Sequence, residues 1–516
     1  MPRSNVQHSF ANVPSANIPR SQFNRSCTLL TTFDADYLIP IFVDPVIPGD
    51  TFNMRCHALL RLNSPTLHPL MDNIQADIHW FFVANRHLWT NWEKMHGAQD
   101  DPNDSISYTT PVLSGATVCS TSGDLADYMG IPLNVVPNNT NINALPFRAY
   151  RFIYDEWYRD QNLQDSVGFA TDDGPDDSTQ SGHHDAPLKR NKRYDYFTAA
   201  LPSPQKGTAV SLWGSADVRT AAAVSGHVGV YSDSTADHQR FDADTTNLHV
   251  SSSTIDAETN KLYISPTETV NDLRLAFQTQ RLLERDARSG TRYREHLLAH
   301  FGVDNNDLRL TRPEFLGGGT LQVQINSVPN TSEDATQKQG ELTGFGVGSG
   351  SAGFTKSFTE WGWVIGIISV RSDITYSQGL DRMWSDQTRY DYPYPVLANI
   401  GEQATLDQEI YHGDDANDSD VWGYMPRYEQ YRFKNSRLTG LMNVDATGTL
   451  ASWHLSEDFT TRPSLDGTFK QGNTTTPLDR AIAIPSEPQF NAHFYFDLKC
   501  ARPLPTYGVP GNIDHL

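Results

Sequence analysis

TFNMRCHALLRL, residues Thr51–Leu62, is the stretch that decides the fold, because apolar and polar side chains alternate along it. The stretches Ile74–Val83 and Phe490–Cys500 alternate in the same way. A period of two predicts a β-strand with one face on a core and the other toward solvent. Burial of one face favours antiparallel sheets over a parallel α/β fold.

These strand-like stretches lie near the two ends of the chain, so their sheet requires pairing between residues that are far apart in sequence. Long connections must then fill the middle of the chain. This arrangement is typical of a sandwich or barrel. The sequence therefore predicts a mainly β fold: a single eight-stranded antiparallel jelly roll with long inserted loops and a few helices.

The composition limits the classes of protein that the chain can be. Its 516 residues are 38% hydrophobic and 11% aromatic, and its 35 glycines and 30 prolines indicate many turns. The formal net charge of −21 disfavours a protein that grips nucleic acid with its whole surface. Four cysteines without Cys-x-x-Cys spacing, and no apolar run long enough to span a bilayer, predict assembly in the cytoplasm without membrane insertion.

The first 26 residues form a segment of their own in composition. They are rich in Ser, Asn and Pro, and they contain Arg3, Arg20 and Arg25 but no acidic residue. Such a segment cannot bury enough apolar surface to fold alone. One interpretation is a terminus without a fixed structure; the other is an arm that contacts neighbouring subunits or DNA phosphates.

The middle of the chain differs from both ends. Residues 208–266 are rich in Ser, Thr, Ala and Asp but contain short apolar runs, which predict a folded insertion with short strands. An apolar stripe at helical spacing predicts a helix over Val270–Arg288. Arginines from Arg281 to Arg294 alternate with Glu284, Asp286 and Glu295, which predicts local salt bridges. We expect Gly344–Gly353 to be a flexible loop.

No motif predicts an enzyme, a cofactor site or a metal site. The pattern Gly348-x-Gly350-x-x-Gly353 lacks the strand-then-helix context of a dinucleotide site. His183 and His184 have no partner at ligand spacing. The acidic run Asp414–Asp420 lacks the Gly and Glu of an EF-hand, which leaves only a weak interface cation site. For the Tyr-Pro run at 390–395, a subunit contact is favoured over base stacking.

Several long segments, in the same order along the chain, resemble one family. They are LHPLMDNIQADIHWFFVANRHLW (67–89), LPFRAYRFIYDEWYRDQNLQ (145–164), LPSPQKG (201–207), LERDARSGTRYREHLLAHFGV (283–303), RYDYPYPVLANIGEQ (389–403) and RPLPTYGVPG (502–511). Together they resemble the major capsid protein of the microviruses (Microviridae), most closely the gokushovirus branch. The resemblance covers most of the chain, from about residue 17 to residue 510.

The resemblance implies a viral jelly roll, sixty copies of which form a T=1 shell around circular single-stranded DNA. It implies an inward-facing arm over 1–26 with DNA-facing Arg3, Arg20 and Arg25, and a jelly roll divided between 27–207 and 267–500, followed by a tail over 501–516. The insertion at 208–266 is expected to project at the three-fold axes and contact a bacterial host receptor. Its candidate receptor-facing residues are Val228, Tyr231, His238, Phe241 and His249.

The implied partners are other copies of this chain, the DNA genome, a small basic DNA-binding protein, and other minor capsid or scaffolding proteins. The residues alone leave two other classes of protein to consider. A carbohydrate-binding or glycan-cleaving β-sandwich would also be rich in aromatic and acidic residues, and would be a monomer or small oligomer. A dedicated nucleic-acid-binding protein is disfavoured by the charge of −21.

Overall fold

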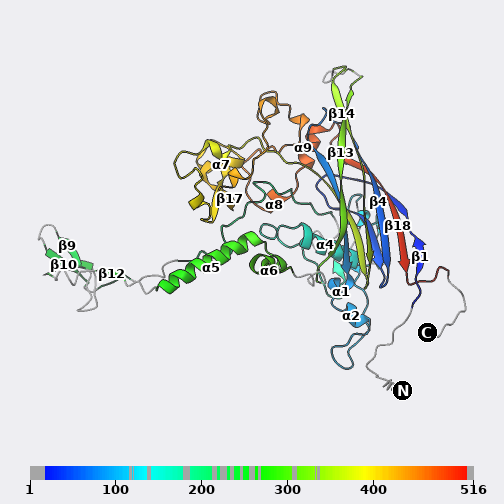
Figure 1. Cartoon of the computed structure of the whole chain (residues 1–516), viewed down its shortest axis with the longest axis horizontal. Coiled ribbons are helices and arrows are strands. Elements are labelled where there is room, and N and C mark those ends of the chain that lie inside the picture. The colour runs from blue at the N-terminus through cyan, green and yellow to red at the C-terminus, as the bar shows by residue number, and fades with distance from the viewer. Residues whose placement is uncertain are drawn as a thin grey trace, which may run out of the picture. The chain divides into compact units, whose positions relative to one another are not determined.

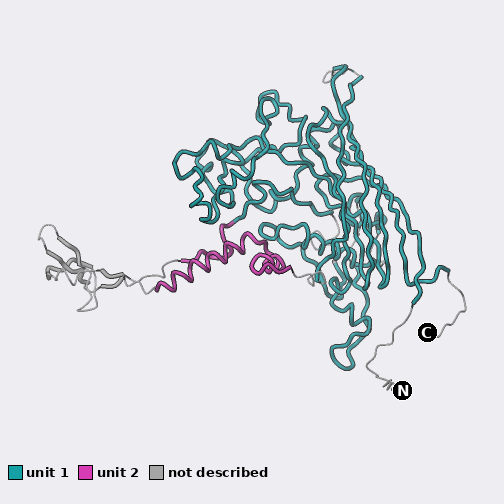
Figure 2. The backbone as a smooth tube through the Cα atoms, viewed as in Figure 1, with its two compact units in different colours: residues 1–202, 305–516 teal, residues 203–304 magenta. Residues whose placement is uncertain are grey.

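The computed structural model describes residues 18–114, 119, 121–135, 141–177, 186–211, 218–220, 229–232, 237–243, 248–254, 262–264, 269–304, 311–331, 333 and 338–507. The chain divides into two compact units, residues 1–202 with 305–516, and residues 203–304 (Figure 2).

One antiparallel sheet organises the first unit (Figure 1). Its strands follow the order β1-β18-β4-β14-β13-β5-β15-β3, and β2 also pairs with β18. The strands are β1 (Ser21–Asn24), β2 (Cys27–Phe33), β3 (Ile39–Val46), β4 (Thr51–Leu62), β5 (Ile74–Ala84), β13 (Glu314–Pro329), β14 (Leu342–Ser357), β15 (Gly362–Ser372) and β18 (Phe490–Arg502). The predicted strands are confirmed as β4, β5 and β18.

Strands β1 and β2 are two parts of one interrupted strand. Asn24, at the end of β1, pairs with Lys499, and Cys27, at the start of β2, pairs with Phe496. The break therefore spans three residues on each side of the pairing, and β1 and β2 share one register on β18. Counted this way the sheet has eight strands, in the halves β2-β18-β4-β14 and β13-β5-β15-β3, which the β13–β14 pairing joins. This is the strand arrangement of a jelly roll, and the predicted fold class is confirmed.

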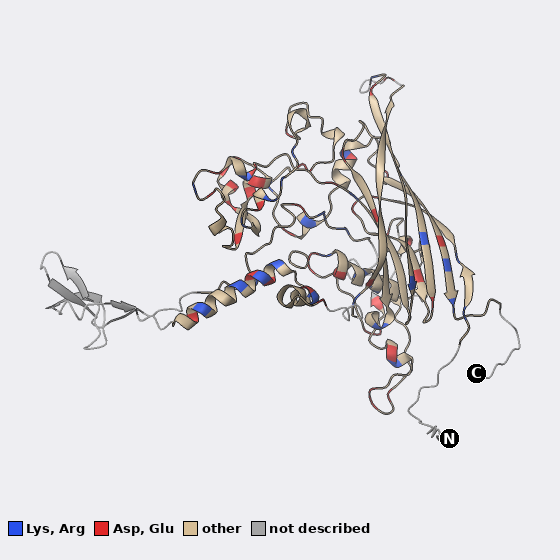
Figure 3. Ribbon diagram, viewed as in Figure 1, with Lys and Arg blue, Asp and Glu red and all other residues tan. Residues whose placement is uncertain are grey.

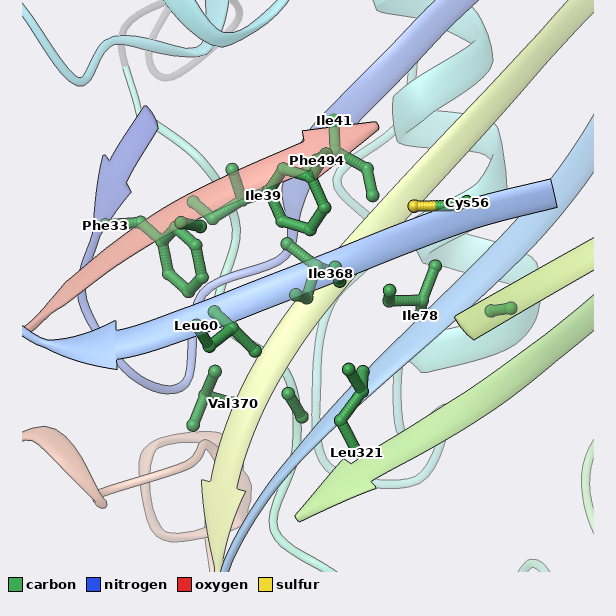
Figure 4. Packing of buried hydrophobic residues seen from close by; sticks show 14 of the residues in the cluster. Phe33, Ile39, Ile41, Cys56, Leu60, Ile78, Leu321, Ile368, Val370 and Phe494 are labelled. Atoms are coloured by element: carbon green, nitrogen blue, oxygen red, sulfur yellow. The ribbon is translucent and has the colours of Figure 1, made fainter. Parts of the chain in front are cut away.

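The core lies between the two halves of the curled sheet. Cys56 and Leu60 of β4 and Phe494 of β18 point toward Ile78 of β5 and Ile368 of β15 (Figure 4). Aromatic contacts between distant strands close the sheet on itself, since the ring centroids of Phe42 in β3 and Phe496 in β18 are 5.2 Å apart. Burial of these apolar faces is the main force that holds the halves together.

Strands β5 and β15 are buried on both faces, which corrects the expectation of one-sided burial for Ile74–Val83. Phe81, Val83, Ile365 and Ile367 point away from the main core, yet each is at most 1% exposed. They pack into a second apolar cluster with residues from helix α4 (Leu145–Ile153), among them Phe147 and Tyr150. Strands β4 and β18 keep the predicted alternation, because their outward-facing polar residues are exposed or half-buried.

The expected flexible loop at Gly344–Gly353 is wrong, because these residues lie within β14. A Cβ on Gly353 would lie 2.3 Å from the carbonyl oxygen of Met54, and a Cβ on Gly350 would lie 2.8 Å from Leu321 Cδ2. The glycines therefore allow neighbouring strands and core side chains to approach closely, and they do not supply flexibility.

Inserted loops and short elements complete the first unit. A third apolar cluster, which includes Tyr196, Phe197 and Trp422, organises the long connection between β15 and β18. The short strands form the pairs β6 (Leu113–Ser114) with β7 (Asp176–Asp177), and β16 (Glu402–Leu406) with β17 (Val421–Pro426). The remaining helices are α1 (Asn85–Leu88), α2 (Trp92–Met95), α3 (Leu125–Tyr128), α7 (Asp407–Ile410), α8 (Gly467–Lys470) and α9 (Thr475–Ala481).

The second unit contains two short sheets and a helical hairpin. Strand β8 (Val218–Thr220) pairs with β12 (Leu262–Ile264), and β10 (Asp237–Ala243) lies between β9 (Gly229–Ser232) and β11 (Leu248–Thr254). Helix α5 (Val270–Ser289) confirms the predicted helix, and α6 (Tyr293–Phe301) follows it. The unit therefore extends beyond the expected insertion at 208–266 and includes both helices. Within the described ranges, no helix combines the length and apolar character needed to cross a bilayer.

Candidate interaction surfaces

The predicted DNA-facing arginines occupy different environments. Arg20 is exposed, and its Nη1 donates to the Gly49 carbonyl oxygen at 3.1 Å and to Thr51 Oγ1 at 3.3 Å. Arg25 is half-buried and donates to both carboxylate oxygens of Asp44, with Nη2 2.7 Å from Oδ1. These hydrogen bonds raise the pKa of Arg25. Arg25 therefore holds the break between β1 and β2 to β3, whereas Arg20 remains open to a ligand. Arg3 lies outside the described residues.

Arg20 adjoins a polar surface that sequence reasoning did not assign. We call the exposed sides of β4 and β18 the β4–β18 face (Figure 3). Pairing places His57 opposite Tyr495, with stacked rings whose centroids are 6.3 Å apart, and Arg55 opposite Asp497. The charged and aromatic members of the face are Arg55, His57, Arg61, His493, Tyr495, Asp497 and Lys499. Three permanent cations against one carboxylate make this face basic on a chain that is acidic overall.

A second surface is apolar. The connection between β15 and β18 exposes many large side chains, and Trp384 (68% exposed) and Tyr390 (62% exposed) are examples. Its exposed apolar residues are Met383, Trp384, Tyr390, Tyr392, Tyr394, Val396, Ile400, Tyr431, Phe433 and Leu441. We call this set the aromatic loop surface. Exposed apolar residues in such numbers are typical of protein–protein interfaces.

Buried polar contacts hold the backbone beneath the aromatic loop surface. Glu409 is 5% exposed, and it accepts hydrogen bonds from Tyr196 Oη at 2.9 Å and from Arg382 Nη1 at 3.2 Å. Burial raises the pKa of Glu409, although the contacts with Arg382 and Tyr196 oppose that shift. The exposed aromatic rings therefore project from a loop with fixed internal contacts, which lowers the entropy lost when a partner binds.

The acidic run Asp414–Asp420 already has a cationic partner, Arg462, within the chain, and His412 also contacts it. Arg462 Nη2 lies 2.8 Å from Asp415 Oδ1 and 2.5 Å from Asp418 Oδ1, and His412 Nδ1 lies 2.9 Å from Asp418 Oδ2. Arg462 therefore balances part of the negative charge of this run, at Asp415 and Asp418.

A groove of about 1120 Å³ beside β2, β4 and β18 is lined by three acidic residues, each of which accepts a hydrogen bond from the backbone. Asp124 accepts the backbone N–H of Thr121, Asp127 accepts that of Gly123, and Asp34 accepts that of Gln489, at 2.8 to 3.0 Å. These carboxylates hold turns in place.

The predicted receptor-facing residues fall on the small sheet of the second unit. Tyr231 in β9 pairs with His238 in β10, and His249 in β11 pairs with Asp242 in β10. Phe241 pairs with Val250 in the same sheet. The backbone therefore brings these four predicted residues onto three neighbouring strands, and Val228 lies outside the described residues.

Sequence reasoning also missed a cluster at the corner between α5 and α6. Asp286 was expected to pair with arginines, but the structure places its carboxylate against His296 and His300. Arginines elsewhere at this corner follow the prediction, since Arg292 pairs with Glu295. The available signal was the spacing of the two histidines in His296-Leu-Leu-Ala-His300, which places both rings on one face of a helix.

Comparison with known proteins identifies relatives over nearly the whole chain. Residues 11–512 match the family model described as "Capsid protein (F protein)". The chain is 42% identical to the capsid protein VP1 of Bdellovibrio phage phiMH2K, over 98% of this chain and 97% of the relative. It is 38% identical to the capsid protein VP1 of Chlamydia phage 1, over 98% of each chain, and 31% identical to that of Spiroplasma virus 4, over 98% and 97%.

Proposed function

Because the chain belongs to the phage capsid protein (F protein) family, we propose that sixty copies of it form a closed T=1 shell around a circular single-stranded DNA genome. It is a major capsid protein of the microvirus type, a component of the virion and a structural protein, not an enzyme. The arrangement of copies, the genome contacts and the host contacts are proposals that rest on this membership.

The aromatic loop surface is the observation that carries the assembly proposal. A closed shell requires several different interfaces on each subunit, and obligate interfaces bury roughly 2,000–5,000 Å² each. The aromatic loop surface offers exposed apolar area for such interfaces, for example at Trp384 and at the tyrosines 390, 392 and 394. Internal contacts of Glu409 with Tyr196 and Arg382 hold this loop in place. The jelly roll supplies the rigid frame that sets the angle between neighbouring copies.

The β4–β18 face supports an inward orientation of this half of the sheet. It lies next to Arg20, in the segment whose family resemblance implies an inward-facing start. Arg55, Arg61 and Lys499 can contact phosphates, while His57 and Tyr495 offer aromatic rings. The net charge of −21 leaves most of the genome charge to be neutralised by salt or by a separate small basic protein.

The insertion at 208–266 is the proposed host-attachment element. It forms its own small sheets within the second unit, so changes in its sequence do not disturb the core of the jelly roll. Its proposed receptor-facing residues are Val228, Tyr231, His238, Phe241 and His249.

Electron microscopy and sedimentation of the purified chain test the assembly proposal. We expect uniform closed particles, formed by the chain alone or after addition of scaffolding proteins and DNA. Trp384→Ser should leave the folded chain intact and prevent shell formation, whereas Trp384→Phe, which keeps an aromatic ring, should still assemble. A chain that stays monomeric under all these conditions would overturn the proposal.

A further inference from the structure

Three potential metal ligands converge at the corner between α5 and α6, within the second unit. His300 Nε2 lies 2.6 Å from Asp286 Oδ1, and His296 Nδ1 lies 3.1 Å from the same oxygen. The three ligand atoms are all within 4.8 Å of one another. The two imidazole ring centroids are 4.4 Å apart, so both rings face the carboxylate from one side of α6.

The local sequence explains why these groups meet. His296 and His300 are four residues apart on α6, and Asp286 lies in the last turn of α5. The helices are joined by a three-residue turn that begins at Gly290, whose φ of +92° favours glycine. A Cβ at Gly290 would lie 2.3 Å from Glu295 Oε2, so the turn is tight and the two helix ends are held close together.

The donor set selects a class of ion. Two imidazole nitrogens and one carboxylate oxygen suit Zn²⁺ and neighbouring transition metals, whereas Ca²⁺ and Mg²⁺ prefer sites made only of oxygen. In a tetrahedral zinc site with bonds of about 2.0–2.1 Å, ligand atoms are about 3.4 Å apart. The two separations from Asp286 Oδ1, 2.6 Å to His300 Nε2 and 3.1 Å to His296 Nδ1, are each within an ångström of that value.

The exposure of the three side chains fits a metal site that solvent reaches from one side only. The side chain of His300 is 9% exposed and that of Asp286 is 22% exposed, whereas that of His296 is 42% exposed. An ion can therefore enter past His296, and the fourth coordination position remains open to water. A neutral imidazole carries its proton on either nitrogen, so both rings can turn a lone pair toward an ion without losing a proton.

We propose that Asp286, His296 and His300 bind one divalent transition-metal ion of the Zn²⁺ class, which clamps α5 to α6. The site does not depend on the shell-forming role of the chain. It would stabilise the helical hairpin that follows the insertion at 208–266, because an ion that binds only the folded corner favours that corner.

Titration of the full-length chain with Co²⁺ alone tests the site, because bound Co²⁺ gives visible absorption bands that report its coordination. We expect one strongly bound Co²⁺ per chain, with bands of tetrahedral type that disappear when Zn²⁺ displaces it. His296→Asn should abolish the bands, and its exposed position should leave the fold intact by circular dichroism. Asp286→Asn is the second variant and should weaken Co²⁺ binding at least tenfold.

Two controls keep the test specific. His57→Asn changes an exposed histidine on β4 and should leave Co²⁺ binding unchanged. The double variant His183→Asn/His184→Asn removes the adjacent histidine pair that the sequence also offers, and it should bind Co²⁺ as the unaltered chain does. The proposal is overturned if the unaltered chain binds no Co²⁺, if His296→Asn binds it equally well, or if only the 183/184 variant loses binding.

Discussion

Lys192 Nζ lies 2.7 Å from Glu457 Oε1, and the two side chains are only 3% and 4% exposed. The ammonium group also lies 4.3 Å from the centroid of the Phe469 ring, and Asn473 Nδ2 donates to the second oxygen of Glu457 at 2.7 Å. One buried ion pair thus joins a loop inserted between β5 and β13 to a loop inserted between β15 and β18. The ion pair therefore fixes two loops that are distant in sequence against each other.

Glu457→Gln should therefore lower the free energy of unfolding by about 3–5 kcal/mol, because it leaves the charge of Lys192 buried without its partner. Urea denaturation of the unassembled chain measures the change. Glu429→Gln is the matched control: Glu429 pairs with Arg432 at 2.7 Å near the surface, and this change should cost less than about 1 kcal/mol. Equal losses in the two variants would contradict a special role for the buried pair.

Asp77 should make part of the stability of the chain depend on pH. Its burial opposes ionisation, but the hydrogen bond from Thr320 and the charges of Arg190 and Arg371 lower its pKa to about 2. Because the folded pKa lies below the unfolded value of about 3.9, this stabilisation of about 2 kcal/mol is present above pH ~4 and is lost as the pH falls toward 2.

Comparison of the unaltered chain with Asp77→Asn across this pH range measures that contribution. The difference in unfolding free energy should shrink as the pH falls. A difference that stays constant from pH 6 to pH 2 would rule out the role of the Asp77 carboxylate.

Gly353→Ala should force β14 away from β4. The added methyl group would lie 2.3 Å from the Met54 carbonyl oxygen and 3.1 Å from Arg55 Cα, and backbone atoms cannot move aside cheaply. We expect a loss of about 1–3 kcal/mol by thermal or urea unfolding, together with a lower yield of shells. Ser351→Ala changes an exposed residue two positions earlier on the same strand and should be nearly neutral. A neutral Gly353→Ala would mean that the two strands adjust easily.

The triple variant Arg20→Ala, Arg55→Ala and Arg61→Ala should still form shells but retain less DNA. Fewer cations facing phosphates also release fewer counterions, so DNA retention should depend less steeply on salt concentration. Genome content per particle, measured from absorbance and sedimentation, tests this. Arg432→Ala removes an exposed cation outside the face and serves as the control. If the triple variant retained as much DNA as the unaltered chain, the proposal that the β4–β18 face points inward would be wrong.

Replacing residues 208–266 with a short Gly-Ser bridge should leave shell formation largely intact and abolish attachment to the host. Helices α5 and α6 are kept, because they lie beyond the deleted segment. Electron microscopy and a cell-binding assay provide the two readouts. If no shells form although the chain remains folded, the insertion is an assembly element and the attachment proposal fails.

The sequence alone determined the fold class, the strands β4, β5 and β18, the helix α5 and the membership of a capsid family. Strict alternation and helical periodicity are local signals, because each depends on which face of a single element is buried. Tertiary structure decided the rest. It buried both faces of β5 and β15, made a strand of the glycine-rich Gly344–Gly353, and joined Lys192 to Glu457. It also brought Asp286 to His296 and His300. These features depend on which distant segments meet, and a local pattern of residues does not encode a partner that lies elsewhere in the chain.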